Sequence, residues 1–353
     1  MDSVIAMYRR KDTRTVHVGN VAIGGQDRVV LQTMTKAPPK SETCIEEIRR
    51  YSEAGAELVR VAVNDAADAR AIRTLKEETD TPLVADIHFD HRLALTAIES
   101  GVDKIRINPG NLNKAEHVRA LAEAAKARNV PIRIGVNSGS LEKDLVKRYG
   151  RTKEAMVGSA RRQAEMLESY GHEKIVVSLK ASDVTLAVEA NLLAAKTMPY
   201  PLHIGITEAG TYEQGTVQSS AGLGVMLFHG IGDTIRVSLT ERREDELRIG
   251  RKLLSSFGLI KGPKLIACPT CGRLAYDMDP LVRRIEAYLE ENPRPITVAI
   301  MGCAVNGPDE AKEADVGIAG GKESGLLFKK GEVVRRVPQD ELYDTLVEAI
   351  ENL

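Results

Sequence analysis

The sequence predicts a (β/α)8 TIM barrel followed by a smaller α+β domain. Short β-branched runs alternate with amphipathic helical segments from Val29 onward, and the rhythm changes after Ser255. Eight parallel strands joined by eight helical crossovers close into a barrel. We therefore predict a barrel over residues 1–257, a linker at Gly258–Lys264 and an α+β domain over residues 264–353.

The barrel strands are predicted at Val29–Met34, Glu57–Val63, Pro82–Ile87, Lys104–Asn108, Pro131–Asn137, Lys174–Lys180, Pro201–Glu208 and Thr234–Thr240. Helices such as Cys44–Ala54, Lys114–Arg128 and Lys153–Ser169 lie between them. Gly or Asn near the helix ends, at Gly55, Gly101, Asn129 and Gly171, is typical of helix termination. A hairpin over Thr15–Ile23 is expected to plug the bottom of the barrel.

Beyond the linker, the pattern predicts a compact α+β domain. One strand leads into Cys268, and a helix near Leu281–Glu291 and a strand over Ile296–Met301 follow it. Three short strands and a final helix complete the domain, at Val316–Ala319, Leu326–Lys329, Val333–Val337 and Asp340–Asn352.

The composition excludes several classes of function. The chain has 353 residues, 43% of them hydrophobic, and a formal net charge of −1, which is typical of a globular protein. It has no tryptophan and only 4% aromatic residues, so we expect no nucleic-acid partner. No stretch has the length of a membrane span or the pattern of a signal peptide, so we expect no membrane partner. Four cysteines without signs of secretion favour a reducing cytoplasm.

Three of the four cysteines are candidate metal ligands. Cys268 and Cys271 form a CxxC pair, and Cys303 lies in a glycine-rich turn. Three thiolates are one short of a closed zinc site or a cubane cluster, which predicts a centre with one exchangeable position. A redox pair and a zinc knuckle are alternatives, but no histidine follows His229, so an iron–sulfur cluster is favoured. Cys44 is predicted to be a packed thiol.

Strand alternation predicts a barrel mouth lined with cations. Alternate side chains share one face of a strand. This parity turns inward a set that comprises Arg60, Asp86, His88, Arg106, Asn108, Arg133, Asn137, Lys180, His203, Thr207, Arg236 and Ser238. Many inward cations with few acids need an anion such as a diphosphate, although single arginines could instead pair with Asp86 or Glu57.

Several polar residues at the strand ends are candidates for acid–base work. Asp86, His88 and Glu208 lie where catalytic groups of a TIM barrel belong, and we assign them as catalytic candidates. Each could equally be a hydrogen-bonding loop residue.

Six motifs are distinctive when they occur together. They are Arg106–Asn111, Gly135–Leu141, Lys180–Asp183, Thr207–Gly210, Cys268–Arg273 and Met301–Pro308. This combination closely resembles the 4-hydroxy-3-methylbut-2-enyl diphosphate synthase family of the methylerythritol phosphate pathway, in its bacterial two-domain form. The resemblance spans nearly the whole chain.

The resemblance implies an enzyme of isoprenoid biosynthesis. Its reaction would be the reductive ring opening and dehydration of 2-C-methyl-D-erythritol 2,4-cyclodiphosphate to 4-hydroxy-3-methylbut-2-enyl diphosphate. A [4Fe-4S] cluster would deliver two electrons, with flavodoxin or ferredoxin as the electron donor. The family is described as a homodimer in which the barrel of one subunit faces the cluster domain of the other.

The resemblance also assigns residues. The implied cluster ligands are Cys268, Cys271, Cys303 and Glu310. The implied diphosphate contacts are Arg60, Arg106, Arg133 and Lys180, with Asp86, His88, Asn137, Ser182, His203 and Glu208 nearby. We add Asn108 to the substrate-binding set. The chain departs from the family at Asp309, where glycine usually precedes the ligand glutamate.

Two other interpretations stay open at this stage. A barrel transferase of the pterin- or corrinoid-binding type would use Asn108, Asn137 and Lys180 to contact a pterin ring, and its cysteines would hold zinc. A zinc-ribbon-like module could instead contact RNA through Arg283, Arg284, Arg335 and Arg336.

Overall fold

The chain forms two compact units in a computed structural model that describes residues 12–26, 28–274, 276–303, 309 and 311–353. One unit extends to Leu259 and the other begins at Ile260, within the predicted linker. Each unit is described separately below.

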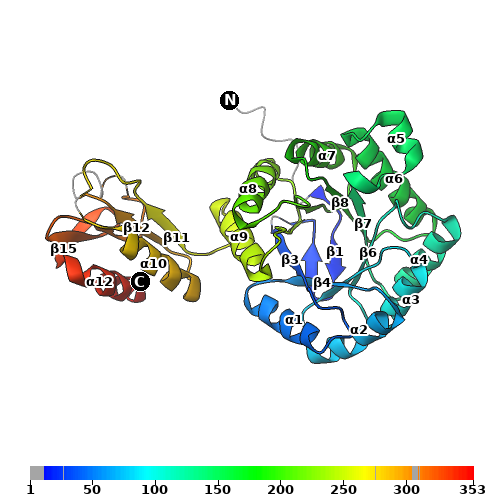
Figure 1. The fold of residues 1–353 in the computed structure, drawn as a ribbon, viewed down its shortest axis with the longest axis horizontal. Coiled ribbons are helices and arrows are strands. Elements are labelled where there is room, and N and C mark those ends of the chain that lie inside the picture. Colours follow the sequence, from blue (N-terminus) through cyan, green and yellow to red (C-terminus); the bar gives the residue numbers. More distant parts are fainter. Residues whose placement is uncertain (1–11, 27, 275, 304–308, 310) are drawn as a thin grey trace. The chain divides into compact units, whose positions relative to one another are not determined.

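The first unit is an eight-stranded parallel barrel surrounded by helices (Figure 1). Its strands are β3 (Val30–Met34), β4 (Leu58–Ala62), β5 (Leu83–Asp86), β6 (Lys104–Ile107), β7 (Ile132–Asn137), β8 (Ile175–Lys180), β9 (His203–Ile204) and β10 (Thr234–Ile235). They are paired in the order β8-β7-β6-β5-β4-β3-β10-β9. A parallel bridge between Val177 and Leu202 brings β8 beside β9, so the prediction of a TIM barrel is confirmed.

The last two barrel strands are shorter than predicted. Residues 201–208 and 234–240 were expected to be extended, but regular pairing covers only two residues of each segment. Single hydrogen bonds continue the ladder on either side, from Val177 N to Pro201 O (2.9 Å) and from Thr207 N to Ala181 O (3.3 Å).

The outer helices follow the predicted order. They are α1 (Thr43–Glu53), α2 (Ala66–Glu78), α3 (His91–Glu99), α4 (Ala115–Ala127), α6 (Lys153–Ser169), α7 (Val184–Thr197), α8 (Tyr212–Phe228) and α9 (Arg243–Ser256). A 3-10 turn at Ser138–Ser140 and the short helix α5 (Lys143–Tyr149) are additions after β7. Gly55 and Gly101, at the predicted helix stops, have φ of 98° and 90°, which glycine adopts without strain.

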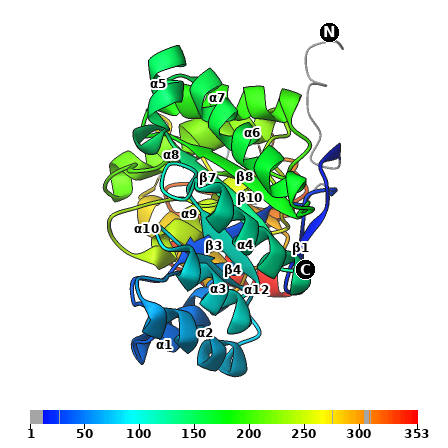
Figure 2. The same ribbon diagram turned by 90° about the vertical axis from the view of Figure 1, so that its right-hand side faces the viewer.

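An N-terminal hairpin closes one end of the barrel, as predicted. It pairs β1 (Val16–Val18) with β2 (Val21–Ile23), and it lies at one end of the barrel in Figure 2. Val18 and Ile23 pack against buried residues near the beginnings of β3, β4 and β5, namely Val30, Leu58 and Val84. The opposite end, at the carboxyl ends of the strands, is therefore the open mouth.

The second unit is an α+β domain built on a five-stranded sheet. Its strands are β11 (Lys264–Ala267), β12 (Thr297–Met301), β13 (Val316–Ala319), β14 (Ser324–Lys329) and β15 (Glu332–Pro338), paired in chain order. The first three are parallel to one another, and β14 pairs antiparallel with both β13 and β15. The apolar faces of α10 (Asp279–Glu291) and α12 (Leu342–Glu351) bury Ile285 and Leu346 against the sheet.

Within the described residues, no helix combines the length and the apolar character that crossing a bilayer requires.

Candidate functional site

Four predicted cations lie inside the barrel. Arg106, Arg133 and Lys180 are 5%, 1% and 8% exposed, and the Arg60 side chain is 13% exposed. They come from strands β4, β6, β7 and β8, and all occupy the inward face that the alternation predicted. Buried cations at this density need counter-charge, so their partners decide what the site can bind.

Asp86 provides counter-charge for two of the arginines. Arg106 Nη1 donates to Asp86 Oδ1 at 3.0 Å, and Arg60 Nε lies 3.8 Å from Asp86 Oδ2. His88 Nε2 lies 3.3 Å from the same Oδ2 atom. Burial acts to raise the pKa of Asp86, but Arg60, His88 and Arg106 outweigh it and hold the pKa well below the ordinary carboxyl value. Asp86 therefore stays ionised and orients the arginines, which is a different task from donating a proton.

The predicted alternative of structural ion pairs is thus correct for Asp86 but wrong for Glu57. Glu57 pairs with Arg28 and accepts a hydrogen bond from Leu31 N at 3.1 Å. Its carboxylate binds these partners near the beginning of the barrel strands, so it does not neutralise the inward cations.

Two glycines provide space for the cations. A Cβ atom at position 135 would lie 2.4 Å from Arg106 Nε, and one at position 205 would lie 2.7 Å from Lys180 Nζ. Arg106 Nη2 also donates to the carbonyl of Gly135 at 3.2 Å. The guanidinium and ammonium groups therefore cross the neighbouring strands where a side chain is missing.

Arg236 forms an ion pair with Glu246. Its Nε and Nη2 atoms lie 3.3 and 3.4 Å from the two carboxylate oxygens of Glu246 on α9. Glu246 also accepts from Leu239 N at 2.9 Å and from Arg243. Of the inward arginines, Arg236 is the one whose charge is matched by a carboxylate outside the strands.

Among the described residues, no carboxylate forms an ion pair with Arg133 or Lys180. The Nε and Nη1 atoms of Arg133 are buried without a hydrogen-bond partner among the described residues. Burial, followed by repulsion from Arg133 and Arg236, lowers the pKa of Lys180 well below its ordinary value. A bound dianion would supply acceptor oxygens for the unpaired Arg133 atoms and negative charge that raises the pKa of Lys180 again.

His203 is fully buried at the first residue of β9. Its Nδ1 atom lies 2.6 Å from Thr234 Oγ1, whereas Nε2 has no partner among the described residues. Burial, and then the nearby Arg133 and Lys180, lower its pKa well below the ordinary histidine value. The ring is therefore neutral and can donate one hydrogen bond into the lumen.

Asn108 organises two loops at the mouth. Its Nδ2 atom donates to Ser140 Oγ at 2.9 Å, and its Oδ1 atom accepts from Gly110 N at 3.0 Å. Because both ends of the amide are engaged, Asn108 holds the loop after β6 against the 3-10 turn after β7. Asn137 ends β7 beside that turn, and Ser182 is exposed just after β8.

Glu208 is exposed in the loop after β9 and has a φ of 55°. This left-handed conformation is uncommon for a residue other than glycine, asparagine or aspartate, and strain of this kind gathers at functional sites. The His88 side chain is 49% exposed in the loop after β5. Two of the three predicted acid–base candidates thus reach solvent at the mouth of the barrel, whereas the third, Asp86, is buried.

The second unit brings two cysteine segments together. Cys268 follows β11 and Cys303 follows β12, and these strands are parallel neighbours. Cys268 N donates to Ile300 O at 3.0 Å, and a Cβ atom at position 302 would lie 3.9 Å from Cys268 Sγ. Cys271 is exposed in the turn that closes with Leu274 N donating to Cys271 O at 2.9 Å.

The predicted fourth ligand, Glu310, lies outside the described residues, whereas its neighbour Asp309 is described and exposed. The described residues do not contain a ready-made metal site of three or more histidine, cysteine or acidic side chains. The donor set nevertheless suits an iron–sulfur cluster, because its cysteines offer soft thiolate ligands and two of them, Cys268 and Cys303, follow adjacent parallel strands. Cys44 is fully buried, and burial raises its pKa to about 11, which confirms that it is a packed thiol.

Comparison with known proteins identifies the family. Residues 13–251 match the GcpE TIM-barrel domain, and residues 264–352 match the GcpE protein C-terminal domain. The chain belongs to the GcpE family. It is 50% identical to the 4-hydroxy-3-methylbut-2-en-1-yl diphosphate synthase (flavodoxin) of Bacillus mycoides strain KBAB4 over 98% of this chain and 95% of that protein. The enzyme of the same name from Caldanaerobacter subterraneus is 49% identical over 98% of both chains.

The barrel also resembles solved structures outside the GcpE family. Yersinia pestis dihydropteroate synthase aligns with a TM-score of 0.51 and 12% identity, over 69% of this chain and 98% of that one. Type I 3-dehydroquinate dehydratase from Clostridium difficile aligns with a TM-score of 0.54 and 14% identity, over 70% of this chain and all of that one. At this identity the likeness concerns the fold alone.

Sequence reasoning missed two residues of this GcpE-family barrel. Lys104 is 0% exposed inside the barrel, and the alternation that turned Arg106 inward could have found it two residues earlier on the same strand. Glu246 had no comparable signal, because it reaches the lumen from an outer helix.

Proposed function

We propose that the chain catalyses the reductive ring opening and dehydration of 2-C-methyl-D-erythritol 2,4-cyclodiphosphate to 4-hydroxy-3-methylbut-2-enyl diphosphate. The observation that carries the proposal is the barrel lumen, where buried cations outnumber the buried carboxylates Asp86 and Glu246. A cyclic diphosphate supplies the missing negative charge. The GcpE-family relatives that are about half identical over the whole chain support the same reaction.

Several residues of the lumen and the mouth have proposed tasks. The diphosphate is bound by Arg60, Arg106, Arg133 and Lys180. Hydrogen bonds to the diphosphate or to the hydroxyl groups of the substrate come from His203, Asn137 and Ser182. Asp86 positions Arg60 and Arg106. Loss of a hydroxyl group as water requires a proton, and the exposed loop residues Glu208 and His88 are the candidates for its delivery.

Cys268, Cys271, Cys303 and Glu310 are the proposed ligands of a [4Fe-4S] cluster. When bound, the cluster supplies the two electrons that the ring opening consumes. A carboxylate is a harder and more labile ligand than a thiolate, so Glu310 would provide the exchangeable position. Flavodoxin is the proposed electron donor, since the relatives carry it in their names, and ferredoxin is the alternative. Such a thiolate-bound centre fits a reducing cytoplasm.

Anaerobic purification followed by metal analysis and a turnover assay tests this function. We expect brown protein with about four irons and four labile sulfides per chain. With reduced flavodoxin, it should convert the cyclic diphosphate to the open-chain product. Colourless protein with about one zinc would contradict the proposal and favour the pterin-type barrel transferase.

The RNA-binding alternative is weaker than the sequence suggested. Arg283 Nε donates to Asp279 at 2.9 Å, Arg335 lies 3.6 Å from Glu348, and Arg284 stacks 3.5 Å from the centroid of the Tyr343 ring. Three of the four arginines named for this alternative thus have partners within the second unit, which weakens the case for an uncompensated basic patch.

We propose that the chain is a homodimer, and the surface of α8 supports this. Glu213 is the one charged residue of this helix. Val217, Val225 and Phe228 are 64%, 44% and 60% exposed on one stripe, and Phe257 extends it. A position 224 Cβ atom would lie 3.8 Å from the Phe257 ring. A helix with an apolar outer stripe needs a cover, and a second copy could bury the same stripe around a twofold axis.

Replacement of Val225 by glutamate tests the dimer. Sedimentation should report a dimer for the wild-type chain and a monomer for Val225→Glu, because a charge in an apolar interface is costly. The control is Phe89→Glu, which changes an apolar residue elsewhere on the barrel that is 74% exposed, against 44% for Val225. A wild-type monomer, or equal effects of both substitutions, would count against this interface.

A further inference from the structure

Lys104 is a buried charge that the proposed site does not use. It is 0% exposed, and its Nζ atom has no hydrogen-bond partner among the described residues. It precedes Arg106 by two residues on the inward face of β6, and it is paired in register with Val84, which packs on the hairpin plug. Lys104 therefore lies deeper in the lumen than Arg106, near the closed end.

The side chain of Gln32, on the inward face of β3, also lacks hydrogen-bond partners among the described residues. Both its Nε2 and Oε1 atoms are buried without a partner among the described residues, and the residue is 1% exposed. Two residues later on this face, Met34 places its sulfur 2.9 Å from Arg60 Nη2, which shows that the face points into the lumen. Buried amides without partners are rare in folded proteins.

Lys104 lies near Arg133 and His203 inside the barrel. Burial is the main cause of the lowered Lys104 pKa, followed by repulsion from Arg133 and Arg60. Lys104 in turn contributes to the lowered pKa of His203. Arg133 Nε and Nη1 and His203 Nε2 are also buried without partners in the described part of the chain. Strands β3, β6, β7 and β9 thus each carry buried polar atoms without partners among the described residues.

The chemistry of this set is mostly that of hydrogen-bond donors. Lysine and arginine only donate, the amide of glutamine offers two donors, and the neutral histidine offers one. The nearby acids are already engaged, Asp86 by Arg106 and Glu246 by Arg236 and Arg243. Unpaired donors with excess positive charge, and no available carboxylate among the described neighbours, match a phosphate group.

We propose that Lys104 and Gln32, together with Arg133 and His203, form an inner tier of the anion site that binds one phosphate group of the substrate. The proposal deepens the proposed function, on which it rests for the identity of the substrate. Without a ligand, the donors of the inner tier are buried without partners, which lowers the stability of the barrel. A bound anion accepts hydrogen bonds from these donors and so stabilises the barrel.

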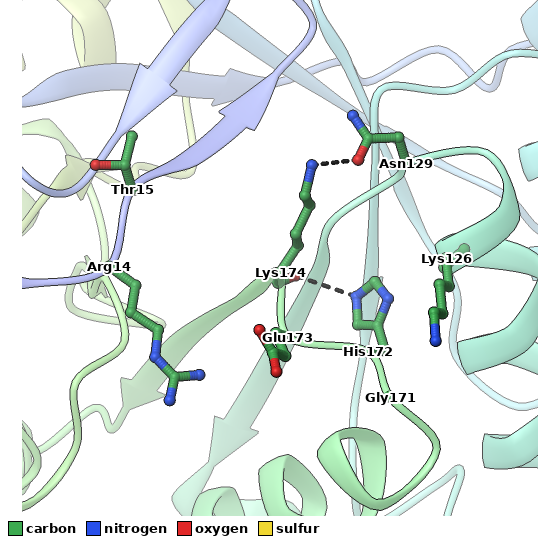
Figure 3. Close-up of a pocket in the computed structure, with 9 residues that line it drawn as sticks. Arg14, Thr15, Lys126, Asn129, Gly171, His172, Glu173 and Lys174 are labelled. Carbon is green, nitrogen blue, oxygen red and sulfur yellow. Dashed lines mark hydrogen bonds between the residues drawn. The ribbon is translucent and has the colours of Figure 1, made fainter.

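The test is Lys104→Met, which keeps the length of the side chain and removes its charge. The matched control is Lys174→Met, at the outer start of β8, where Lys174 donates to Asn129 beside a cavity outside the lumen (Figure 3). The melting temperature without ligand and the affinity for inorganic diphosphate, measured by calorimetry, are the two readouts. Neither readout depends on the cluster or on turnover.

The two readouts should change in opposite directions. Lys104→Met is expected to raise the melting temperature by a few degrees and to weaken diphosphate binding at least tenfold, whereas Lys174→Met should leave both close to wild type. A lower melting temperature in Lys104→Met would reveal a structural partner and overturn the proposal. A higher melting temperature with unchanged affinity would also overturn it.

Gln32→Leu provides an independent test if Lys104→Met fails to fold. It should likewise stabilise the ligand-free chain and weaken diphosphate binding. Competition by 2-C-methyl-D-erythritol 2,4-cyclodiphosphate separates a substrate site from a site for free phosphate, and absence of competition would overturn the assignment to substrate. A chain that binds diphosphate through Lys104 but fails to reduce the cyclic diphosphate would instead contradict the proposed function.

Discussion

Replacing Cys303 with serine should remove the iron and abolish the reductase activity. Cys303 is a proposed ligand, and it follows β12, the parallel neighbour of the strand β11 that leads into Cys268. A serine hydroxyl is a poor ligand for iron at neutral pH, and a cubane cluster with three remaining ligands is unstable. We expect iron and sulfide to fall from about four per chain to well below one.

Cys44→Ser is the matched control for this prediction. Cys44 is buried in α1 of the barrel, and burial raises the pKa of its thiol to about 11, so it is not available as a thiolate. This variant should keep its full iron content and its visible spectrum. Loss of iron from Cys44→Ser, or retention of it in Cys303→Ser, would contradict the proposed ligand set.

Replacing Glu208 with glutamine should lower kcat by about a hundredfold or more and leave KM within a few-fold of wild type. Glu208 is exposed at the mouth and is held at a φ of 55°, which directs its side chain from a strained loop. Glutamine keeps the shape and the hydrogen-bonding capacity but cannot deliver a proton. Steady-state kinetics with the cyclic diphosphate and reduced flavodoxin measure both constants.

Two further variants separate chemistry from backbone effects. Glu208→Gly relieves the strain of the left-handed conformation and removes the carboxylate, so it should be as inactive as the glutamine variant but no less stable. Glu241→Gln changes an exposed carboxylate in the loop after β10 and should be nearly silent. If Glu208→Gln instead raised KM and left kcat unchanged, Glu208 would be assigned to substrate binding.

The order of the elements and the direction of the inward side chains were predictable from the sequence. Both depend on local rules, because β-branched runs favour strands and alternation fixes the face of each residue. Arg106 and Arg133 therefore lie inside the barrel as expected. Helix ends at Gly55 and Gly101 were equally local, since their positive φ angles favour glycine.

The tertiary structure alone decided how the charges are compensated. Asp86 orients Arg60 and Arg106 across three strands, and Glu246 reaches Arg236 from an outer helix and Thr33 Oγ1 at 3.4 Å across a separation of 213 residues. Partners so distant along the chain leave no periodic signal. Whether a buried cation such as Lys104 is satisfied depends on every side chain that shares its space, because electrostatic and hydrogen-bonding requirements are properties of the packed lumen and not of a single strand.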